Sequence, residues 1–278
     1  MSNIYLTNRL KRVFHITEES LKDTDAIYPI NIFLALLLEN TGTLKNLNNQ
    51  YNKYINNLYD LSININKKKI QKRIYHPFFT HSISSTTLEV INKSLVIMNS
   101  TNQIYLNEGH LLKAIFSSAN EIKDFFSPSD IENILKITAS PKDLIVDLNL
   151  YIPLHYDLND FKISAASKEL EYPIYNYVGK KFNYNWADTL INLFYLDKIP
   201  IYICTHKNNI IGFAAYDAFG SSFFGPMGVS DAFRNKKIGH SLLSICLENM
   251  KKRGDSYCLI KDAGPIEFYE RCCNARLV

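Results

Sequence analysis

Cysteine is scarce in this 278-residue chain and is confined to its second half. The five cysteines lie between residues 204 and 273, and no two of them have the Cys-x-x-Cys spacing. A disulfide framework or a structural zinc site needs paired or regularly spaced cysteines. The sequence therefore argues against a small disulfide-stapled protein and predicts no metal site. Cys246, on the apolar side of an expected helix, is interpreted as a small buried residue.

Long apolar runs are missing as well. The longest, residues 30–38, is too short to cross a bilayer, which takes about 20 apolar residues. No leader with a basic start and an apolar centre opens the chain. These absences predict a cytoplasmic protein that does not act at a membrane.

Neither sign of charge is in large excess. The formal net charge is +4, which is too small to argue for a nucleic-acid partner. The basic run at residues 67–73 is interpreted as a solvated loop or helix end. A Gly-x-x-x-x-Gly-Lys-Ser/Thr phosphate loop is absent, so the chain is not expected to be an ATPase.

The first half of the chain is predicted to be helical. An amphipathic helix that begins near Thr7 is followed by a buried helix at 30–39, which Gly42 is expected to end. The same plan recurs at 87–98 and 107–116, about 78 to 80 residues later, and such an offset indicates two similar helical units. Ser127 and Asp130 are start signals for a last helix at 131–137.

Two segments of this half resemble the Clp repeat, the double four-helix module of Clp ATPases. Residues 7–13 are similar to its opening helix, and residues 108–115 (EGHLLKAI) to its Glu-His-Leu-Leu signature, with Gly109 as an inserted residue. The resemblance implies that residues 1–138 form an all-α module that docks protein partners and is not catalytic. His110 is expected to form structural hydrogen bonds rather than to bind a metal.

The pattern changes from helical to alternating near residues 139–141, where we place a domain boundary. The second half, residues 141–278, is predicted to mix strands and helices in an α/β fold. A first strand is expected at 144–152, and two helices at 157–197 with a break near Pro173. A hairpin at 200–216 with its turn at Asn208-Asn209, and strands at 223–229 and 256–260, follow.

The most informative stretch is residues 222–253, a strand, a polar loop and a helix that opens near Ile238. A helix N-terminus presents unpaired N–H groups and a partial positive charge, so it is suited to bind a phosphate. Gly239 would let a phosphate approach the main chain. The alternative is an ordinary strand–loop–helix with a solvated basic turn.

This stretch resembles the coenzyme A loop of the GNAT acetyltransferases. Val229, Arg234 and Gly239 match that family's pattern, and Phe268-Tyr-Glu-Arg271 resembles the core of its last helix. Lys237 departs from the pattern because the family usually has glycine there. The resemblance covers residues 141–278 and implies an α/β GNAT fold with coenzyme A or acetyl-CoA bound between two splayed strands. The residues that it implies at the cofactor are Met227, Gly228, Val229, Arg234, Asn235, Lys236, Lys237, Ile238, Gly239, His240 and Ser241.

The same resemblance places Tyr269 at the position of the general acid that protonates the departing thiolate. The alternative for Tyr269 is a tyrosine packed against the sheet. Asp217, at the end of a strand, is the preferred candidate for a general base, ahead of Glu267 and His240. Cys272 and Cys273 follow Tyr269 closely, but nothing beside either marks a nucleophile.

These features predict an acetyl-CoA-dependent N-acetyltransferase that acylates a primary amine, on a small molecule or a peptide, by direct attack in a ternary complex. The alternative is a non-catalytic sensor or adaptor that binds CoA and uses the helical half to bind a protein. The family normally adds a further strand pair after its last helix, and this chain stops there. We therefore expect the end of the sheet to be absent, shortened or supplied by another chain, which would favour a homodimer.

Overall fold

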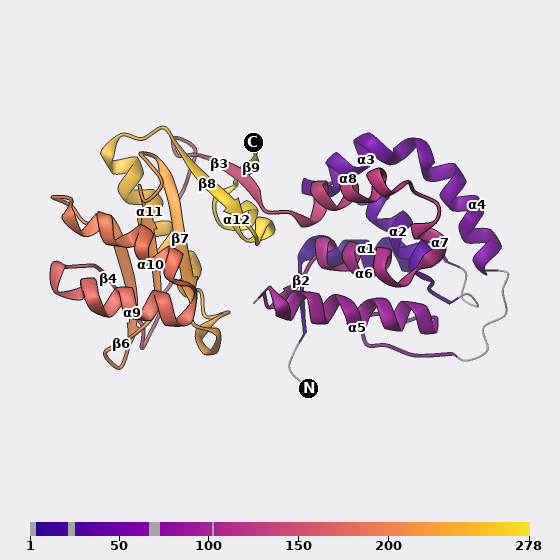
Figure 1. The fold of residues 1–278 in the computed structure, drawn as a ribbon, viewed down its shortest axis with the longest axis horizontal. Coiled ribbons are helices and arrows are strands. Elements are labelled where there is room, and N and C mark those ends of the chain that lie inside the picture. The colour runs from indigo at the N-terminus through magenta and orange to yellow at the C-terminus, as the bar shows by residue number, and fades with distance from the viewer. Residues whose placement is uncertain (1–3, 22–25, 67–72, 102) are drawn as a thin grey trace. The chain divides into compact units, whose positions relative to one another are not determined.

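The computed structural model describes residues 4–21, 26–66, 73–101 and 103–278 and divides the chain into two compact units, Met1–Ser140 and Pro141–Val278 (Figure 1). Of the basic run at 67–73, only Arg73 is among these residues. Within the described ranges, every helix is too short or too polar to cross a membrane.

Unit 1 is built from helices, as predicted. Thr7, Ser84 and Ser127 each accept a hydrogen bond from a first-turn N–H, which starts α1, α5 and α8. Gly42 opens α3 rather than ending α2, so that detail was wrong. The helices are α1 (Asn8–Glu19), α2 (Pro29–Leu38), α3 (Gly42–Tyr51), α4 (Ile55–Asn66), α5 (Ser85–Ser100), α6 (Glu108–Ser118), α7 (Asn120–Lys123) and α8 (Pro128–Ala139).

The two halves of unit 1 repeat one plan. Helix α2 contacts α1, α3 and α4, and α6 makes the corresponding contacts with α5, α7 and α8. Two short strands that sequence reasoning missed, β1 (Tyr5–Leu6) and β2 (Tyr105–Leu106), pair in parallel before α1 and α6. Ile27, just before α2, and Ile83, just before α5, form an isolated parallel bridge. If α1 corresponds to α5 and α2 to α6, this bridge is the counterpart of the β1–β2 pairing. The predicted repeat is therefore present as two four-helix halves with the same plan of contacts.

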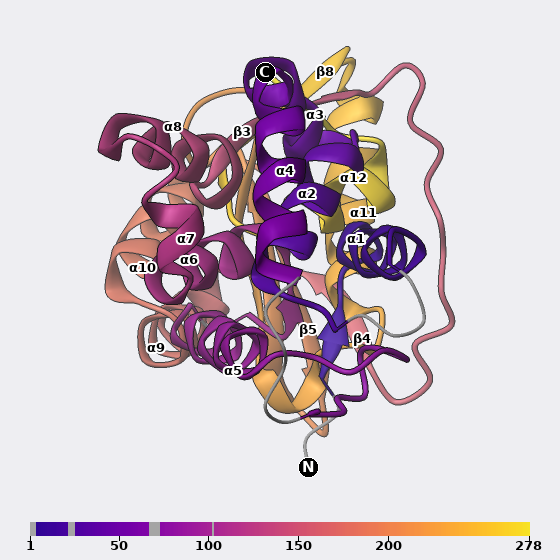
Figure 2. The same ribbon diagram turned by 90° about the vertical axis from the view of Figure 1, so that its right-hand side faces the viewer.

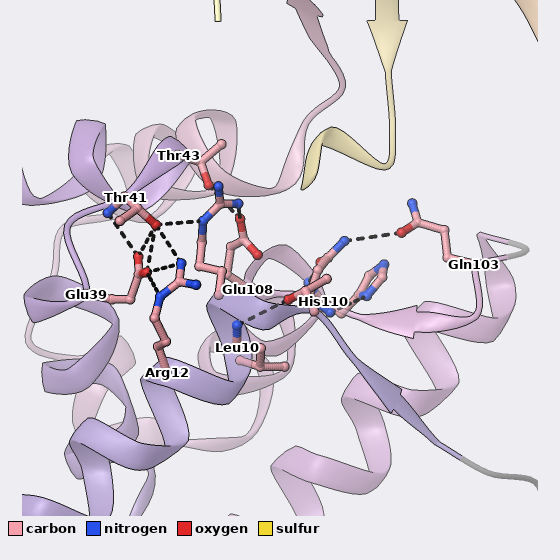
Figure 3. A network of polar contacts seen from close by, with 11 residues as sticks. Leu10, Arg12, Glu39, Thr41, Thr43, Gln103, Glu108 and His110 are labelled. Carbon is pink, nitrogen blue, oxygen red and sulfur yellow. Dashed lines mark hydrogen bonds and ion pairs between the residues drawn. The ribbon is translucent and has the colours of Figure 1, made fainter. Parts of the chain in front are cut away.

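A buried ion pair joins the two halves. Arg9 Nη1 lies 2.5 Å from Glu108 Oε1, which also accepts a hydrogen bond from Thr43 at 2.8 Å (Figure 3). Nearby, His110 accepts the Asn107 N–H and so caps α6. Gly109 is there because a Cβ would lie 2.8 Å from the backbone of Thr138 and Ala139 in α8.

Unit 2 contains a seven-stranded sheet in the order β4-β5-β6-β7-β8-β3-β9. All neighbours are antiparallel except β7 and β8. The strands are β3 (Lys142–Asp147), β4 (Lys162–Ala165), β5 (Ile201–His206), β6 (Asn209–Tyr216), β7 (Phe223–Val229), β8 (Tyr257–Ala263) and β9 (Arg276–Leu277). The helices are α9 (Glu171–Lys181), α10 (Tyr184–Ile191), α11 (Ile238–Arg253) and α12 (Ile266–Cys273).

The far end of this sheet is completed by the chain itself. Strand β3, which precedes the rest of the unit in sequence, pairs with β8, and the short β9 pairs with the other edge of β3. Leu144 and Val146 of β3 are fully buried. This removes the reason for expecting a second chain at the sheet edge.

Two boundaries in unit 2 were wrong. The first strand ends at Asp147, whose carboxylate accepts the N–H groups of Asn149 and Leu150 in a turn. Pro173 does not break a helix but lies in the first turn of α9, where its missing N–H is not needed. Asn183 caps the next helix by accepting the Trp186 N–H, so the break falls there.

Two further differences concern residues 157–209. Strand β4 occupies residues that were expected to be helical. The turn between β5 and β6 is Lys207-Asn208, both with positive φ (49° and 64°), one position earlier than expected. Such a pair of left-handed residues is typical of the tight hairpin turn that matches the twist of the strands.

Helices cover both faces of the sheet. One face packs against α11 and α12 around Leu242, Leu243 and Met250, and the other against α9 and α10 around Ile174, Val178 and Phe213. Because side chains alternate along a strand, neighbours such as Phe213 and Ala214 belong to different faces.

A long connection without regular structure, residues 148–161, leads from β3 to β4 (Figure 2). We call it the strap. It is needed because β3 and β4 lie toward opposite edges of the sheet, so the chain must cross from one to the other. Tyr151 donates a hydrogen bond to Ser244, and Lys251 donates to the carbonyls of Asn149 and Tyr151, so the strap is fastened to α11.

Candidate functional site

Strands β7 and β8 separate after a short pairing. They are paired only at Phe223 with Leu259 and at Phe224 with Ile260, although β7 continues to Val229. Residues 225–229 therefore have no ladder partner on the β8 side. An extended group can enter such an opening and bind the exposed main chain as an extra strand would.

The orientation of the Val229 main chain follows from the pairing on its other side. The Ser230 N–H donates to the Ile211 carbonyl of β6 at 2.8 Å. Successive N–H groups of a strand point to opposite sides, so the Val229 N–H is directed away from β6 and toward the opening. The Val229 N–H is therefore a main-chain donor available to a group that enters the opening.

The loop after β7 ends in the N-terminus of α11. Lys237 is the N-cap, with φ 63°, and its carbonyl accepts the Ser241 N–H. Among the described residues, the N–H groups of Ile238, Gly239 and His240 have no hydrogen-bond partner. Three donors and the positive end of a 16-residue helix thus converge at one point.

Gly239 leaves the approach to these donors open. A Cβ at this position would lie 3.7 Å from the ring of Phe268 and 3.8 Å from Val229, which are ordinary contacts. Packing therefore does not require glycine here. A ligand that approaches the main chain closely would require it.

Arg234 is held against the end of β7. Its Nε donates to the Val229 carbonyl at 3.1 Å, and its Nη2 pairs with Asp231 at 2.8 Å. The guanidinium therefore fixes the loop onto the strand and carries positive charge beside the opening.

The two lysines of the loop lie over aromatic rings. The Lys237 ammonium is 5.1 Å from the ring centre of Tyr156, and Lys236 is 5.5 Å from Phe161 and 5.7 Å from Phe233. Tyr156 and Phe161 belong to the strap. Sequence reasoning missed both, because the strap has neither strand nor helix periodicity.

His240 is buried at the same place. Its exposed fraction is 7%, its ring is 4.9 Å from that of Tyr156, and its Nε2 has no partner among the described residues. Burial and the charge of Lys237 lower the pKa of His240, so the imidazole is neutral at pH 7. An unpaired buried nitrogen is costly unless a ligand completes it.

Tyr269 lies at the base of the opening. Its ring contacts Phe224, one of the two β7 residues that still pair with β8, and Phe268. The residue is 8% exposed, and the described residues give its hydroxyl no hydrogen-bond partner. Burial, followed by nearby cysteines, raises the pKa of Tyr269, so the phenol stays protonated at neutral pH.

Asp217 is at the other end of the strands. Its N–H donates to Phe223, the first residue of β7, about 20 Å along the strand from Val229. Its carboxylate pairs with Arg253 and accepts the Ser222 N–H. The structure thus brings Val229, Gly239 and His240 together at the mouth of the opening, whereas Tyr269 and Asp217 contact Phe224 and Phe223 at its base.

The comparisons with known proteins agree with this geometry. Residues 197–272 match the family described as "Acetyltransferase (GNAT) domain". This stretch, about a quarter of the chain, is similar to a GNAT acetyltransferase domain. Such domains are those of acyltransferase enzymes. The matched residues include β7, α11 and Tyr269, whereas β3, the strap and β4 lie outside them.

No curated protein matches the chain. Solved structures similar to it include a GCN5-related N-acetyltransferase from Sphaerobacter thermophilus (15% identity, TM-score 0.43, 55% of this chain and 54% of that one). Another is a GCN5-related N-acetyltransferase from Kribbella flavida (11% identity, TM-score 0.39, 60% of this chain and 72% of that one). A third is a glucosamine N-acetyltransferase region of a fungal multi-domain β-N-acetylglucosaminidase (15% identity, TM-score 0.42, 58% of this chain and 22% of that one). The chain spans only about half of the first protein and a fifth of the third.

A groove of about 510 Å³ lies on the α9 side of the GNAT domain, next to the end of β7. Tyr177 and Ser230 form a hydrogen bond of 2.8 Å in its wall, and burial raises the pKa of Tyr177. The groove is lined by Tyr177, Lys181, Phe182, His206, Asn209, Ile210, Ile211, Ser230, Asp231, Ala232 and Phe233.

Aromatic residues of α9 and α10 reach the main chain of β7. The Phe182 ring covers Gly228 so closely that a Cβ would lie 2.4 Å from it, and Trp186 stacks on Phe182 at 5.8 Å. Trp186 is the one tryptophan of the sequence, and only the Phe182 ring separates it from the main chain of β7 at Gly228.

The cysteines of the GNAT domain are free thiols. Burial raises the pKa of Cys272 to about 11 and of Cys273 to about 12. Both stay protonated at neutral pH, which argues against a thiolate nucleophile. Among the described residues, no group of three or more histidine, cysteine, aspartate or glutamate side chains could hold a metal ion.

Proposed function

We propose that unit 2 is an acetyl-CoA-dependent N-acetyltransferase that transfers an acetyl group to a primary amine. The observation that carries the proposal is the opening between β7 and β8, with the Val229 N–H at its side and the unpaired donors of α11 at its mouth. The unpaired Nε2 of His240 and the room above Gly239 fit a polar ligand at this position.

Each group at the opening has one task. The Val229 N–H polarises the thioester carbonyl and stabilises the negative charge that develops on its oxygen. The N–H groups of residues 238–240, with Arg234, Asn235, Lys236, Lys237 and Ser241 around them, bind the diphosphate. The acceptor nitrogen attacks the carbonyl carbon directly, the carbon–sulfur bond breaks, and the product is an amide.

Tyr269 supplies a proton to the departing sulfur. Its hydroxyl is protonated throughout the neutral range because burial raises its pKa. Its ring contacts Phe224, where the opening ends, and Phe268, whose ring is next to Gly239. The attacking amine must lose a proton in turn; Asp217 stays a prediction for that base, and its pairing with Arg253 does not support it.

The test is a CoA-release screen of the full chain over polyamines, amino acids, aminoglycosides and peptides. With an accepted amine, we expect Tyr269→Phe to lower kcat at least ten-fold while leaving CoA affinity within about two-fold. Gly239→Ala should weaken CoA binding, because its Cβ occupies the approach to the helix N-terminus. Quenching of Trp186 fluorescence by CoA provides the binding readout.

Gly239→Ala also controls for folding. Its Cβ makes only ordinary contacts, and alanine is favoured over glycine in helices by roughly 1 kcal/mol. Its thermal midpoint should therefore be equal to or above that of the wild type. Unchanged CoA affinity in Gly239→Ala, or full turnover in Tyr269→Phe, would contradict the proposal.

A second candidate is a CoA sensor without turnover. It is favoured by the engagement of Asp217 with Arg253, which leaves the opening without the expected base. Tight CoA binding with no CoA release across the amine panel would support the sensor and not the enzyme.

We also propose that unit 1 is a double Clp-repeat-like module that binds a protein partner. The reciprocal pairing of β1 with β2 and of Ile27 with Ile83 supports an internal repeat of this kind. An acetyl acceptor on a protein would then be recruited by unit 1. Peptide acceptors whose turnover does not depend on residues 1–140 would contradict that role.

A further inference from the structure

We propose that Tyr156 of the strap is a positioning residue for the cofactor. It holds the Lys237 ammonium beside the N-terminus of α11, where that charge meets the phosphate groups of CoA. The inference rests on the proposed function, because it concerns how the same site recognises its ligand. It adds a segment that lies outside the residues matched by the GNAT family.

The strap is fixed independently of the loop that it meets. Tyr151 is 5% exposed and donates to Ser244 at 2.9 Å, and Lys251 donates to two strap carbonyls at 3.3 and 3.0 Å. These contacts are made at Ser244, near the middle of α11, and at Lys251, near its C-terminal end. The strap then runs to the other end of the helix, where Tyr156 contacts both His240 and Lys237.

Lys237 stands at a position that favours glycine. Its φ of 63° is left-handed, a conformation that L-residues other than glycine, asparagine and aspartate rarely adopt. Lys207 in the β5–β6 turn has a similar φ, so the role of Lys237 is argued from the contact of its side chain. The side chain reaches the Tyr156 ring, within the distance of a cation–π contact.

The charge of this lysine is available to a ligand. Within the described parts of the chain, neither Lys237 nor Lys236 has a carboxylate within ion-pair distance. Both ammonium groups are instead placed over aromatic rings, which attract a cation without neutralising it. A phosphate can therefore pair with each ammonium while the ring keeps it in place.

The buried, unpaired nitrogen of His240 is a second observation that indicates a ligand at this position. Its side chain lies in the first turn of α11, is more than nine-tenths buried, and has an unpaired Nε2. The imidazole contacts the Tyr156 ring on one side and faces the main chain of Cys272 in α12 on another, so it lies where the strap, α11 and α12 meet. Tyr156, Lys237 and His240 thus form one side of the phosphate site.

The experiment compares Tyr156→Leu with Tyr156→Phe in the full chain, using CoA and acetyl-CoA as ligands. Tyr156→Leu should weaken CoA binding about three- to ten-fold and raise KM for acetyl-CoA with kcat within two-fold. Tyr156→Phe keeps the ring face and should retain the wild-type affinity. Acetyl-pantetheine, which lacks the phosphate groups, should be used equally well by all three proteins.

A double-mutant cycle with Lys237→Gly assigns the effect to the ammonium. Lys237→Gly should weaken CoA binding in the wild type and add little in the Tyr156→Leu background. Tyr195→Leu, an exposed tyrosine (74%) in the same unit, controls for the loss of an aromatic residue. Additive effects in the cycle would overturn the positioning role.

The outcomes distinguish the proposed function from the role of Tyr156. A wild type that binds neither CoA nor acetyl-CoA overturns the proposed function and this inference together. A wild type that binds CoA, with Tyr156→Leu binding equally well, overturns only the role of the strap. Equal losses for CoA and acetyl-pantetheine would show that Tyr156 supports the fold rather than the phosphate site.

Discussion

Lys237 is the residue at which sequence and geometry conflict most directly. A lysine in the left-handed region costs about 1 kcal/mol relative to glycine, and its φ is 63°. A chain selected only for stability would have glycine there. The contact of its ammonium with Tyr156 gives a physical reason for keeping a cation at this point.

His110 supports a prediction about pH. Burial, with a smaller contribution from Lys113, lowers the pKa of His110 from 6.5 to about 4. The unfolded chain therefore binds a proton between pH 6.5 and about 4 that the folded chain does not. As the pH falls through this window, the free energy of unfolding should decrease, and His110 should account for up to about 3 kcal/mol of the decrease.

The variant that tests this is His110→Gln. Glutamine at the third position of a helix can replace the cap that His110 makes to the Asn107 N–H, but it does not titrate. Urea unfolding followed by circular dichroism, which reports mainly on helical unit 1, should show a shallower loss of stability for the variant from pH 7 to pH 4.5. Parallel pH profiles for the two proteins would contradict the assignment.

At the scale of elements, the strap depends on a few polar contacts with α11. Tyr151→Phe removes the hydrogen bond to Ser244, which keeps a contact with Glu248 at 3.3 Å. We expect a loss of about 1 kcal/mol in unit 2, seen as a thermal midpoint lower by about 4 °C. Exposed Tyr195→Phe is the matched control and should leave the midpoint unchanged. A midpoint for Tyr151→Phe equal to that of the control would show that this bond does not hold the strap.

At the scale of the molecule, β3 decides where unit 2 can be cut. The family match begins at residue 197, yet β3, at residues 142–147, lies between β8 and β9 and buries Leu144 and Val146. A fragment of residues 141–278 should fold with a cooperative thermal transition. A fragment of residues 150–278 exposes the edge of β8 and should aggregate or fail to fold.

Size-exclusion chromatography and circular dichroism of the two fragments, beside the full chain, check this. A monomeric 150–278 fragment with the same thermal midpoint as 141–278 would show that β3 is dispensable. The same comparison tests the domain division, which requires that 141–278 fold without unit 1.

Sequence reasoning was most successful where local pattern and local structure coincide. The helices near Thr7, at 30–39 and at 107–116, and the strand–loop–helix at 223–253, have strong periodicity and cap residues, and each is present. It failed where a residue supports two outcomes. Pro173 is compatible with a break or with a first turn, and only the packing of α9 on the sheet decides between them.

The sequence by itself determined the α/β character of unit 2, the helical character of unit 1, and the loop from Val229 to Gly239, because these depend on spacing between residues close along the chain. Only the tertiary structure decided that β3 completes the sheet, that the strap brings Tyr156 to Lys237, and that Asp217 pairs with Arg253. Those outcomes are contacts between segments far apart in sequence. No local pattern encodes them, since they arise only when whole faces of the sheet and helices bury each other.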